Sequence, residues 1–256
     1  MMGHRRPAVI QELRTRIAAT ERIESDEVGA GRPILVLGQP AIDEALPWSG
    51  LPLGCLHEIV GQGISGFAAA SGFVCALLGW LNNINGDDMV KPGVTVLWCL
   101  RAHEVREHGV PYAPGFAILG LDPAHTIITR GRRDVDILWA MEEGLRTSEV
   151  AAVVGETSGV DFTRSRRLQL AAEASGVTAF ILHRGEDMPA SAAVTRWRVM
   201  SMPSDDIGHT RWQLELLRCR GGTPNTWFVE LNDETSDFTV APEFRNGTSE
   251  PQRAYA

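Results

Sequence analysis

The segment HEIVGQGISGFAAASG, at 57–72, joins an apolar run to a glycine-rich turn and then to a series of small residues. Gly61 and Gly66 have the spacing of the two glycines in the pattern G-x-x-x-x-G-K-[ST], whose backbone N–H groups surround phosphates. In that pattern a lysine then reaches the terminal phosphates, and a hydroxyl binds magnesium. Here Phe67 and Ala68 follow, so the turn lacks both the cation and the magnesium ligand.

This glycine-rich turn has two interpretations. In the first, a weak anion site is formed by the backbone N–H groups of Gly61, Gly63, Ser65 and Gly66. In the second, the glycines only allow a tight turn between a strand and a helix. We favour the second interpretation because glycine spacing alone is a weak signal. We therefore expect no cofactor and no ATPase activity.

The carboxylates and histidines are poorly placed for metal chemistry. Glu156 follows an apolar run at the point where a nucleotide hydrolase has its magnesium-binding aspartate, but no hydroxyl in the glycine-rich turn would share the metal. We interpret Glu156 as a solvated carboxylate at a strand end, with a site at the sheet edge as the alternative. His103 and His108 are one residue further apart than the pair of a zinc-binding helix, and His57 fits a core histidine. We expect no metal site and no catalytic residue.

Two groups of arginines are candidates for contact with the phosphates of DNA. The alternative is that they lie at solvated helix starts and form salt bridges with Asp134, Asp136 or Glu173. The net charge of −8 favours this alternative because it opposes non-specific binding to DNA. The candidates are Arg130, Arg132 and Arg133 in the first group, and Arg164, Arg166 and Arg167 in the second.

The elements that must position these residues alternate along the chain. Apolar runs predict buried strands at 56–60, 94–100, 149–154 and 177–182, and helical spacing predicts helices at 67–81, 132–146 and 163–176. After residue 190, alternating polar and apolar residues predict antiparallel strands. The sequence therefore predicts an α/β fold with a mostly parallel central sheet covered by helices and with antiparallel strands at the C-terminal end.

The two ends of the chain differ from its centre. Residues 8–24 place Leu13 and Ile17 on one apolar face of a predicted amphipathic helix, and a linker follows. The tail is polar and contains proline and glycine, which is typical of disorder. We therefore expect a helix and linker at 1–28, one folded domain at 29–240 and a disordered tail at 241–256.

Four apolar side chains are candidates for contact with another protein, namely Leu13, Ile17, Trp197 and Trp212. The N-terminal helix either packs on its own domain or meets another subunit, and we slightly favour contact between subunits of a homo-oligomer. The two tryptophans lie beside arginines, and both residue types are enriched at binding hot spots. Their period-two alternation also fits ordinary core strands, which is the interpretation that we favour.

The composition is that of a soluble protein. The chain has 256 residues, of which 44% are hydrophobic and 22% are charged. Its four cysteines form no C-x-x-C pair, which fits reduced thiols in the cytoplasm. No secretion signal is visible, and the longest apolar stretch, at 73–81, is too short to span a bilayer. We expect a cytoplasmic protein without membrane contact.

Three segments, at 42–61, 118–156 and 195–233, resemble the ATPase core of the bacterial RecA recombinase in their order and spacing. Their motifs LPxGxLHEI, LGLDP, AMEE, VVGE, TRWRV and RWxLELLRCRGG are most similar to the ImuA family, RecA-like proteins of bacterial damage-inducible mutagenesis operons. The resemblance covers residues 34–233 and implies a RecA-like domain.

The resemblance also implies a role in the SOS response to DNA damage. ImuA proteins accompany ImuB, a relative of Y-family polymerases, and an error-prone C-family DNA polymerase in translesion synthesis and induced mutagenesis. The implied partners are an ImuB-type protein directly, the C-family polymerase indirectly, and RecA itself.

The departures from RecA argue against catalysis and against binding of DNA in the way that RecA binds it. Leu100 and Arg101 stand where RecA has the carboxylate that activates water, and the two DNA-binding loops shorten to 155–163 and 183–191. The arginines at 164–167 lie on the side where RecA holds DNA, which makes them the better DNA candidates. We predict a non-catalytic RecA-like accessory protein. The alternatives are a recombinase paralogue that binds single-stranded DNA and a RecA-family ATPase with an atypical site.

Overall fold

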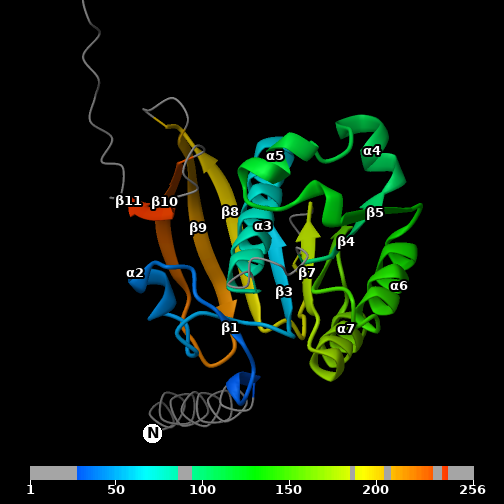
Figure 1. Cartoon of the computed structure of the whole chain (residues 1–256), viewed down its shortest axis with the longest axis horizontal. Helices are drawn as coiled ribbons and strands as arrows, with labels where there is room; N and C mark the ends of the chain where they lie inside the picture. The colour runs from blue at the N-terminus through cyan, green and yellow to red at the C-terminus, as the bar shows by residue number, and fades with distance from the viewer. Residues whose placement is uncertain (1–27, 86–93, 185–187, 205–208, 233–237, 242–256) are drawn as a thin grey trace, which may run out of the picture.

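The computed structural model describes residues 28–85, 94–184, 188–204, 209–232 and 238–241. Its centre is a nine-stranded sheet with the strand order β11-β10-β9-β8-β3-β7-β6-β4-β5 (Figure 1). Six neighbouring strands are parallel. They are β3 (Leu56–Val60), β4 (Val96–Arg101), β5 (Thr126–Gly131), β6 (Ala152–Thr157), β7 (Thr178–His183) and β8 (Thr195–Met202).

The remaining strands of this sheet continue from β8 in antiparallel order. They are β9 (His209–Cys219), β10 (Asn225–Asn232) and β11 (Phe238–Ala241). The predicted α/β fold, with a mostly parallel sheet and antiparallel C-terminal strands, is confirmed. The edge strand β5 was not predicted from the sequence, and its Ile127 and Ile128 are exposed.

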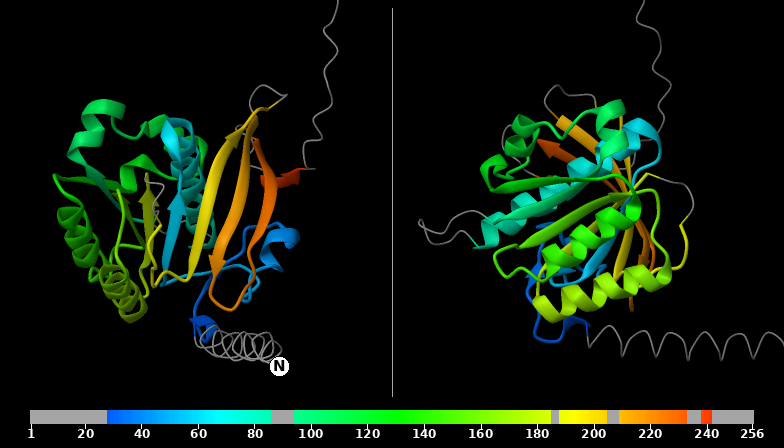
Figure 2. Two further views of the ribbon diagram at one scale, coloured as in Figure 1. Left: turned by 180° about the vertical axis from the view of Figure 1, so that it is seen from behind. Right: turned by 90° about the vertical axis from the view of Figure 1, so that its right-hand side faces the viewer.

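Helices cover both faces of the sheet (Figures 1 and 2). On one face lies α3 (Gly63–Asn85), and on the other lie α6 (Asp134–Leu145) and α7 (Phe162–Ser175). The shorter elements are β1 (Ile34–Leu35), α2 (Pro40–Asp43), β2 (Leu51–Pro52), α4 (Ala102–His108), α5 (Ala113–Ile118) and the 3-10 turn Pro123–His125.

The central helix α3 is longer than the helix predicted at 67–81. The apolar stretch at 73–81, which was judged too short to span a bilayer, is part of this longer helix. Its 23 residues include a segment, Gly63–Asn82, that is long and apolar enough by composition to cross a bilayer, with a mean hydropathy of 1.8. In the structure 67% of that segment is buried, as in the core helix of an α/β domain.

Helix α7 has the boundaries that its flanking residues dictate. The Asp161 side chain accepts a hydrogen bond from the backbone N–H of Arg164, which satisfies an otherwise free donor at the helix start. At the other end Gly176 has a φ of 80°, the left-handed conformation that glycine adopts without a Cβ clash. The helix predicted at 163–176 is therefore confirmed to within one residue at each end.

The C-terminal tryptophans belong to the core. Trp197 and Trp212 are 1% and 3% exposed, and their rings lie 5.9 and 6.2 Å from the ring of Phe73 on α3. This corrects their assignment as partner contacts, because a side chain already buried against α3 presents no surface to another protein. All four cysteines are buried as free thiols.

Several predictions fall outside the described residues. The N-terminal helix with Leu13 and Ile17 and most of the predicted tail lie there, so the proposed division into three parts stays a prediction.

Candidate functional site

The glycine-rich turn is short, and its first and last glycines lie close together. Strand β3 ends at Val60 and α3 begins at Gly63, so Ser65 and Gly66 lie in the first turn of the helix. A Cβ atom at Gly61 would come within 2.2 Å of the Gly66 carbonyl oxygen, which explains why a glycine is needed there. Of the four residues proposed as an anion loop, Gly61 and Gly66 are thus packed against each other, whereas Gly63 and Ser65 are exposed.

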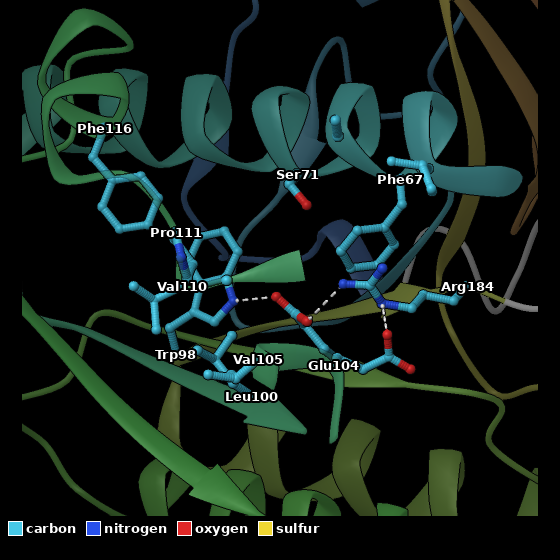
Figure 3. Close-up of a pocket in the computed structure, with 14 residues that line it drawn as sticks. Phe67, Ser71, Trp98, Leu100, Glu104, Val105, Val110, Pro111, Phe116 and Arg184 are labelled. Atoms are coloured by element: carbon cyan, nitrogen blue, oxygen red, sulfur yellow. Dashed lines mark hydrogen bonds and ion pairs between the residues drawn. The ribbon is translucent and has the colours of Figure 1, made fainter. Parts of the chain in front are cut away.

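The next residue, Phe67, carries a cation on its aromatic face (Figure 3). The guanidinium carbon Cζ of Arg184, directly after β7, lies 3.3 Å from the centroid of the Phe67 ring. Phe67 is 6% exposed, so this cation–π contact is largely shielded from water. Such a contact contributes about 1–2 kcal/mol when it is desolvated.

Two carboxylates hold Arg184 in place. Its Nε lies 3.4 Å from Oε2 of Glu104 on α4, and its Nη2 lies 3.4 Å from Oε2 of Glu156 on β6. The other carboxylate oxygen of Glu156 accepts a hydrogen bond of 3.0 Å from the indole Nε1 of Trp98 on β4. Figure 3 shows these contacts, which we call the Arg184 cluster: Phe67, Trp98, Glu104, Glu156 and Arg184.

Glu156 is not the solvated carboxylate that the sequence indicated. It lies inside β6 and is 5% exposed. Burial raises the pKa of Glu156, while the hydrogen bond from Trp98 and the charge of Arg184 oppose that rise. The sequence interpretation was wrong because the partners of Glu156 come from distant parts of the chain.

A cavity of about 250 Å³ lies beside the Arg184 cluster, at the ends of β4, β6 and β7. Ligand pockets for small molecules usually have roughly 300–1,000 Å³, so this one is small. Its walls are mainly apolar and include Phe67, Trp98 and Phe116, with the last two rings stacked at 5.3 Å. The arrangement suits an apolar side chain better than a charged phosphate.

Exposed apolar side chains lie in the wall of this cavity and in the segment next to it. Ile64 and Val110 line the cavity, whereas Tyr112 and Ile118 lie at the start and end of the adjoining helix α5, and Ile118 lines a neighbouring pocket. Their exposed fractions are 73% for Ile64, 49% for Val110, 73% for Tyr112 and 48% for Ile118. We call these four residues the apolar rim. No feature of their local sequence had singled them out.

A second cluster of buried charges lies in the central sheet and is centred on Glu58, on β3. Glu58 is fully buried and accepts hydrogen bonds from Ser191 Oγ at 2.5 Å and from Arg196 Nε at 2.6 Å, and His183 Nε2 lies 3.7 Å away. Burial acts to raise the pKa of Glu58, but these three partners outweigh it and lower the pKa.

The predicted arginine groups do not each form one surface. Arg133 pairs with Asp136 at 3.0 Å, as the salt-bridge alternative predicted, and Arg130 and Arg132 are exposed on and after β5. In the second group Arg164 pairs with Asp161 at 3.5 Å.

The rest of the second group also separates. Arg167 pairs with Glu142 on α6 at 2.6 Å. Arg166 instead lines a separate groove, which Arg32 also lines. Among the predicted salt-bridge partners, Glu173 lies near Arg32.

The histidines and carboxylates show no metal geometry. Within the described residues, no group of three or more His, Cys, Asp or Glu side chains is arranged to hold a metal ion. His57 is fully buried and bonds to Thr195 Oγ1 at 2.8 Å and to the Pro52 carbonyl at 2.9 Å. Burial lowers the pKa of His57 to about 4, which confirms a neutral core histidine.

No family model matches the chain. The chain is 36% identical over 219 residues to Protein ImuA of Caulobacter vibrioides strain NA1000 / CB15N, covering 78% of this chain and 84% of that protein. Protein ImuA of Caulobacter vibrioides strain ATCC 19089 / CIP 103742 / CB 15 matches to the same extent.

Proposed function

The chain belongs to the ImuA family, and from this premise we propose that it is a non-catalytic accessory protein of SOS-induced translesion synthesis. Family membership supports a general role in the ImuA–ImuB mutagenesis system. The proposed role is narrower: in the cytoplasm, the protein contacts an ImuB-type polymerase homologue and RecA, and through ImuB it serves an error-prone C-family polymerase.

The observation that carries the non-catalytic role is the Arg184 cluster. Where a phosphate-binding helix has its lysine, this chain has Phe67, and the only guanidinium of the cluster, on Arg184, is paired with Glu104 and Glu156. A phosphate would have to displace two carboxylates from that guanidinium and would be repelled by both. The site therefore favours association over nucleotide hydrolysis.

The apolar rim supports a proposal for where the partner binds. Large apolar side chains gathered around a cavity are typical of protein-binding surfaces, because burying them on a partner removes them from water. Ile64 and Tyr112 are the most exposed of the four, so they have the most area to bury. We place the ImuB-type partner on this rim, with one of its apolar side chains in the cavity.

The test is co-purification of the full chain with the co-encoded ImuB-type protein. Recovery of a complex supports the role, and Ile64→Asp or Tyr112→Asp should reduce it because a charge would be buried on binding. Ile127→Asp is the matched control, since Ile127 is 54% exposed on the edge strand β5, outside the rim. A failure of the wild-type chain to retain the partner contradicts the role.

A further inference from the structure

Three arginines converge on one groove at the edge where the parallel strands begin. The groove has a volume of about 360 Å³ and lies between α7, the segment before β1 and the end of β9. Its lining is mostly polar and consists of Val28, Arg32, Arg166, Gln169, Leu170, Glu173 and Arg220. It is thus distinct from the Phe67 cavity, which lies at the opposite ends of these strands.

Two of the three guanidiniums are fixed by backbone carbonyls. Arg32 Nη1 donates a hydrogen bond of 2.6 Å to the carbonyl of Gly54, and Arg220 Nη2 donates one of 3.1 Å to the carbonyl of Ala192. A guanidinium has five N–H donors, so each of these retains donors for a ligand. Because both are already positioned, binding costs little additional side-chain entropy.

The single carboxylate of the groove has partners on two sides. Glu173 Oε1 accepts a hydrogen bond of 2.8 Å from Gln169 Nε2 and lies 3.9 Å from Arg32 Nη2. Gln169 is itself fixed, since it is 2% exposed and accepts a hydrogen bond of 2.8 Å from the Leu56 backbone N–H. With three guanidiniums against one carboxylate, the groove is locally cationic in a chain of net charge −8.

Arg32 also contacts the buried thiol of Cys55, with 3.7 Å between Nη1 and Sγ. Burial raises the pKa of Cys55, the charges of Arg32 and Arg220 lower it, and the charge of Glu173 raises it.

We propose that this groove binds a phosphate group through Arg32, Arg166 and Arg220. Guanidinium groups bind phosphate oxygens through paired N–H donors, and a concave site with several of them selects a compact oxyanion. The phosphate belongs either to a nucleic-acid backbone or to a free phosphorylated molecule. The site does not depend on the proposed accessory role.

The arginines at 164–167 divide accordingly. Arg164 and Arg167 are paired with Asp161 and Glu142, whereas Arg166 lines the groove and is exposed. Of the arginines at 164–167, only Arg166 therefore remains as the expected phosphate contact. The other contacts come from Arg32 and Arg220, which the sequence did not single out.

The experiment measures binding of a fluorescein-labelled oligothymidylate to the full chain by anisotropy at low salt, and binding of pyrophosphate by calorimetry. Arg166→Glu should weaken binding about 10-fold or more, because it replaces a charged donor by a repelling carboxylate. The matched control is Arg164→Glu on the same helix, which makes the same charge change outside the groove and should alter affinity less than about 2-fold. Circular dichroism checks that both variants fold.

The outcomes separate the two sources of phosphate. Arg166-dependent binding of the oligonucleotide identifies a nucleic-acid backbone, and Arg166-dependent binding of pyrophosphate alone identifies a free phosphorylated molecule. The proposal is overturned if wild-type protein binds neither probe at low salt. It is also overturned if Arg164→Glu weakens binding as much as Arg166→Glu does, since the effect would then follow net charge alone.

Discussion

The guanidinium of Arg184 lies over the ring of Phe67, with 3.3 Å between Cζ and the ring centroid. The two residues come from different layers of the fold, since Phe67 belongs to the second turn of α3 and Arg184 follows β7. The space next to the start of α3 is therefore occupied by a guanidinium whose charge is already neutralised by carboxylates.

Removing the ring of Phe67 should destabilise the fold. Phe67→Ala deletes a side chain that is 6% exposed, so a cavity opens and the cation–π contact is lost. We expect a loss of about 3–5 kcal/mol in the free energy of unfolding, measured by urea denaturation. Ile64→Ala, three residues away but 73% exposed, is the control and should cost less than about 0.5 kcal/mol.

Restoring the phosphate-binding residues should not restore ATP hydrolysis. In the double variant Phe67→Lys, Ala68→Thr, the new ammonium would lie close to the guanidinium of Arg184, and Glu104 and Glu156 would still exclude phosphate. We expect no steady ATP turnover and reduced stability, because two cations held close together in a largely buried site repel each other and the ring contact is lost. Turnover above that of the wild-type chain in a phosphate-release assay would contradict this account of the site.

The buried carboxylate of Glu156 should make stability fall as pH rises. Its pKa is raised in the folded protein, so its contribution is fully present below the unfolded pKa of about 4.5 and is lost as pH passes the raised folded value. Glu156→Gln retains an oxygen acceptor for Trp98 and cannot titrate. Relative to wild type, this variant should become more stable with increasing pH in urea titrations above pH 4.5. A constant difference across that range would refute the raised pKa.

The contribution of Glu58 to stability should change with pH in the opposite sense to that of Glu156. Its folded pKa is lowered, so its contribution is present above the unfolded pKa of about 4.5 and is lost as pH falls through the lower folded value. At neutral pH, Glu58→Gln should cost about 3–5 kcal/mol, because Arg196 loses its buried counter-charge. Acid unfolding curves of the two proteins should converge as the pH drops. Curves that stay parallel would show that Glu58 is already protonated in the native state.

The four thiols should be unreactive in the folded protein. Burial raises the pKa of Cys99 and of Cys219 to about 12 and also raises the pKa of Cys55 and Cys75. Because the thiolate is the reactive form, native protein should react slowly with Ellman's reagent, and all four thiols should react in denaturant. Rapid labelling of a native thiol would show that its segment opens readily.

Much of the fold could be predicted from periodicity. The run at 56–60 coincides with β3, and the run at 177–182 is one residue from β7, because continuous apolar runs fit strands covered on both sides. The run at 149–154 was placed too early, since β6 continues through Glu156 and Thr157. Polar residues ended the predicted strand, but in the structure both are buried within it.

The candidate site was only partly predictable. The absence of a lysine and a hydroxyl after Gly66 can be read directly from the sequence. The partners that replace them cannot, because Trp98, Glu104 and Arg184 meet Phe67 and Glu156 only through the parallel arrangement of β4, β6 and β7. The grouping of Arg32 and Arg220 with Arg166 is likewise tertiary, and no local pattern marks it.

Strand β8 pairs in parallel with β3 on one side and antiparallel with β9 on the other. A premature stop codon anywhere upstream of Thr195 would therefore do more than trim an appendage. It would remove Trp197 and Trp212 from their contacts with Phe73 on α3, and it would leave β3 as an unpaired sheet edge, open to pairing with other chains. Nonsense alleles that stop translation shortly before the codon of Thr195 should consequently behave as complete loss of the protein.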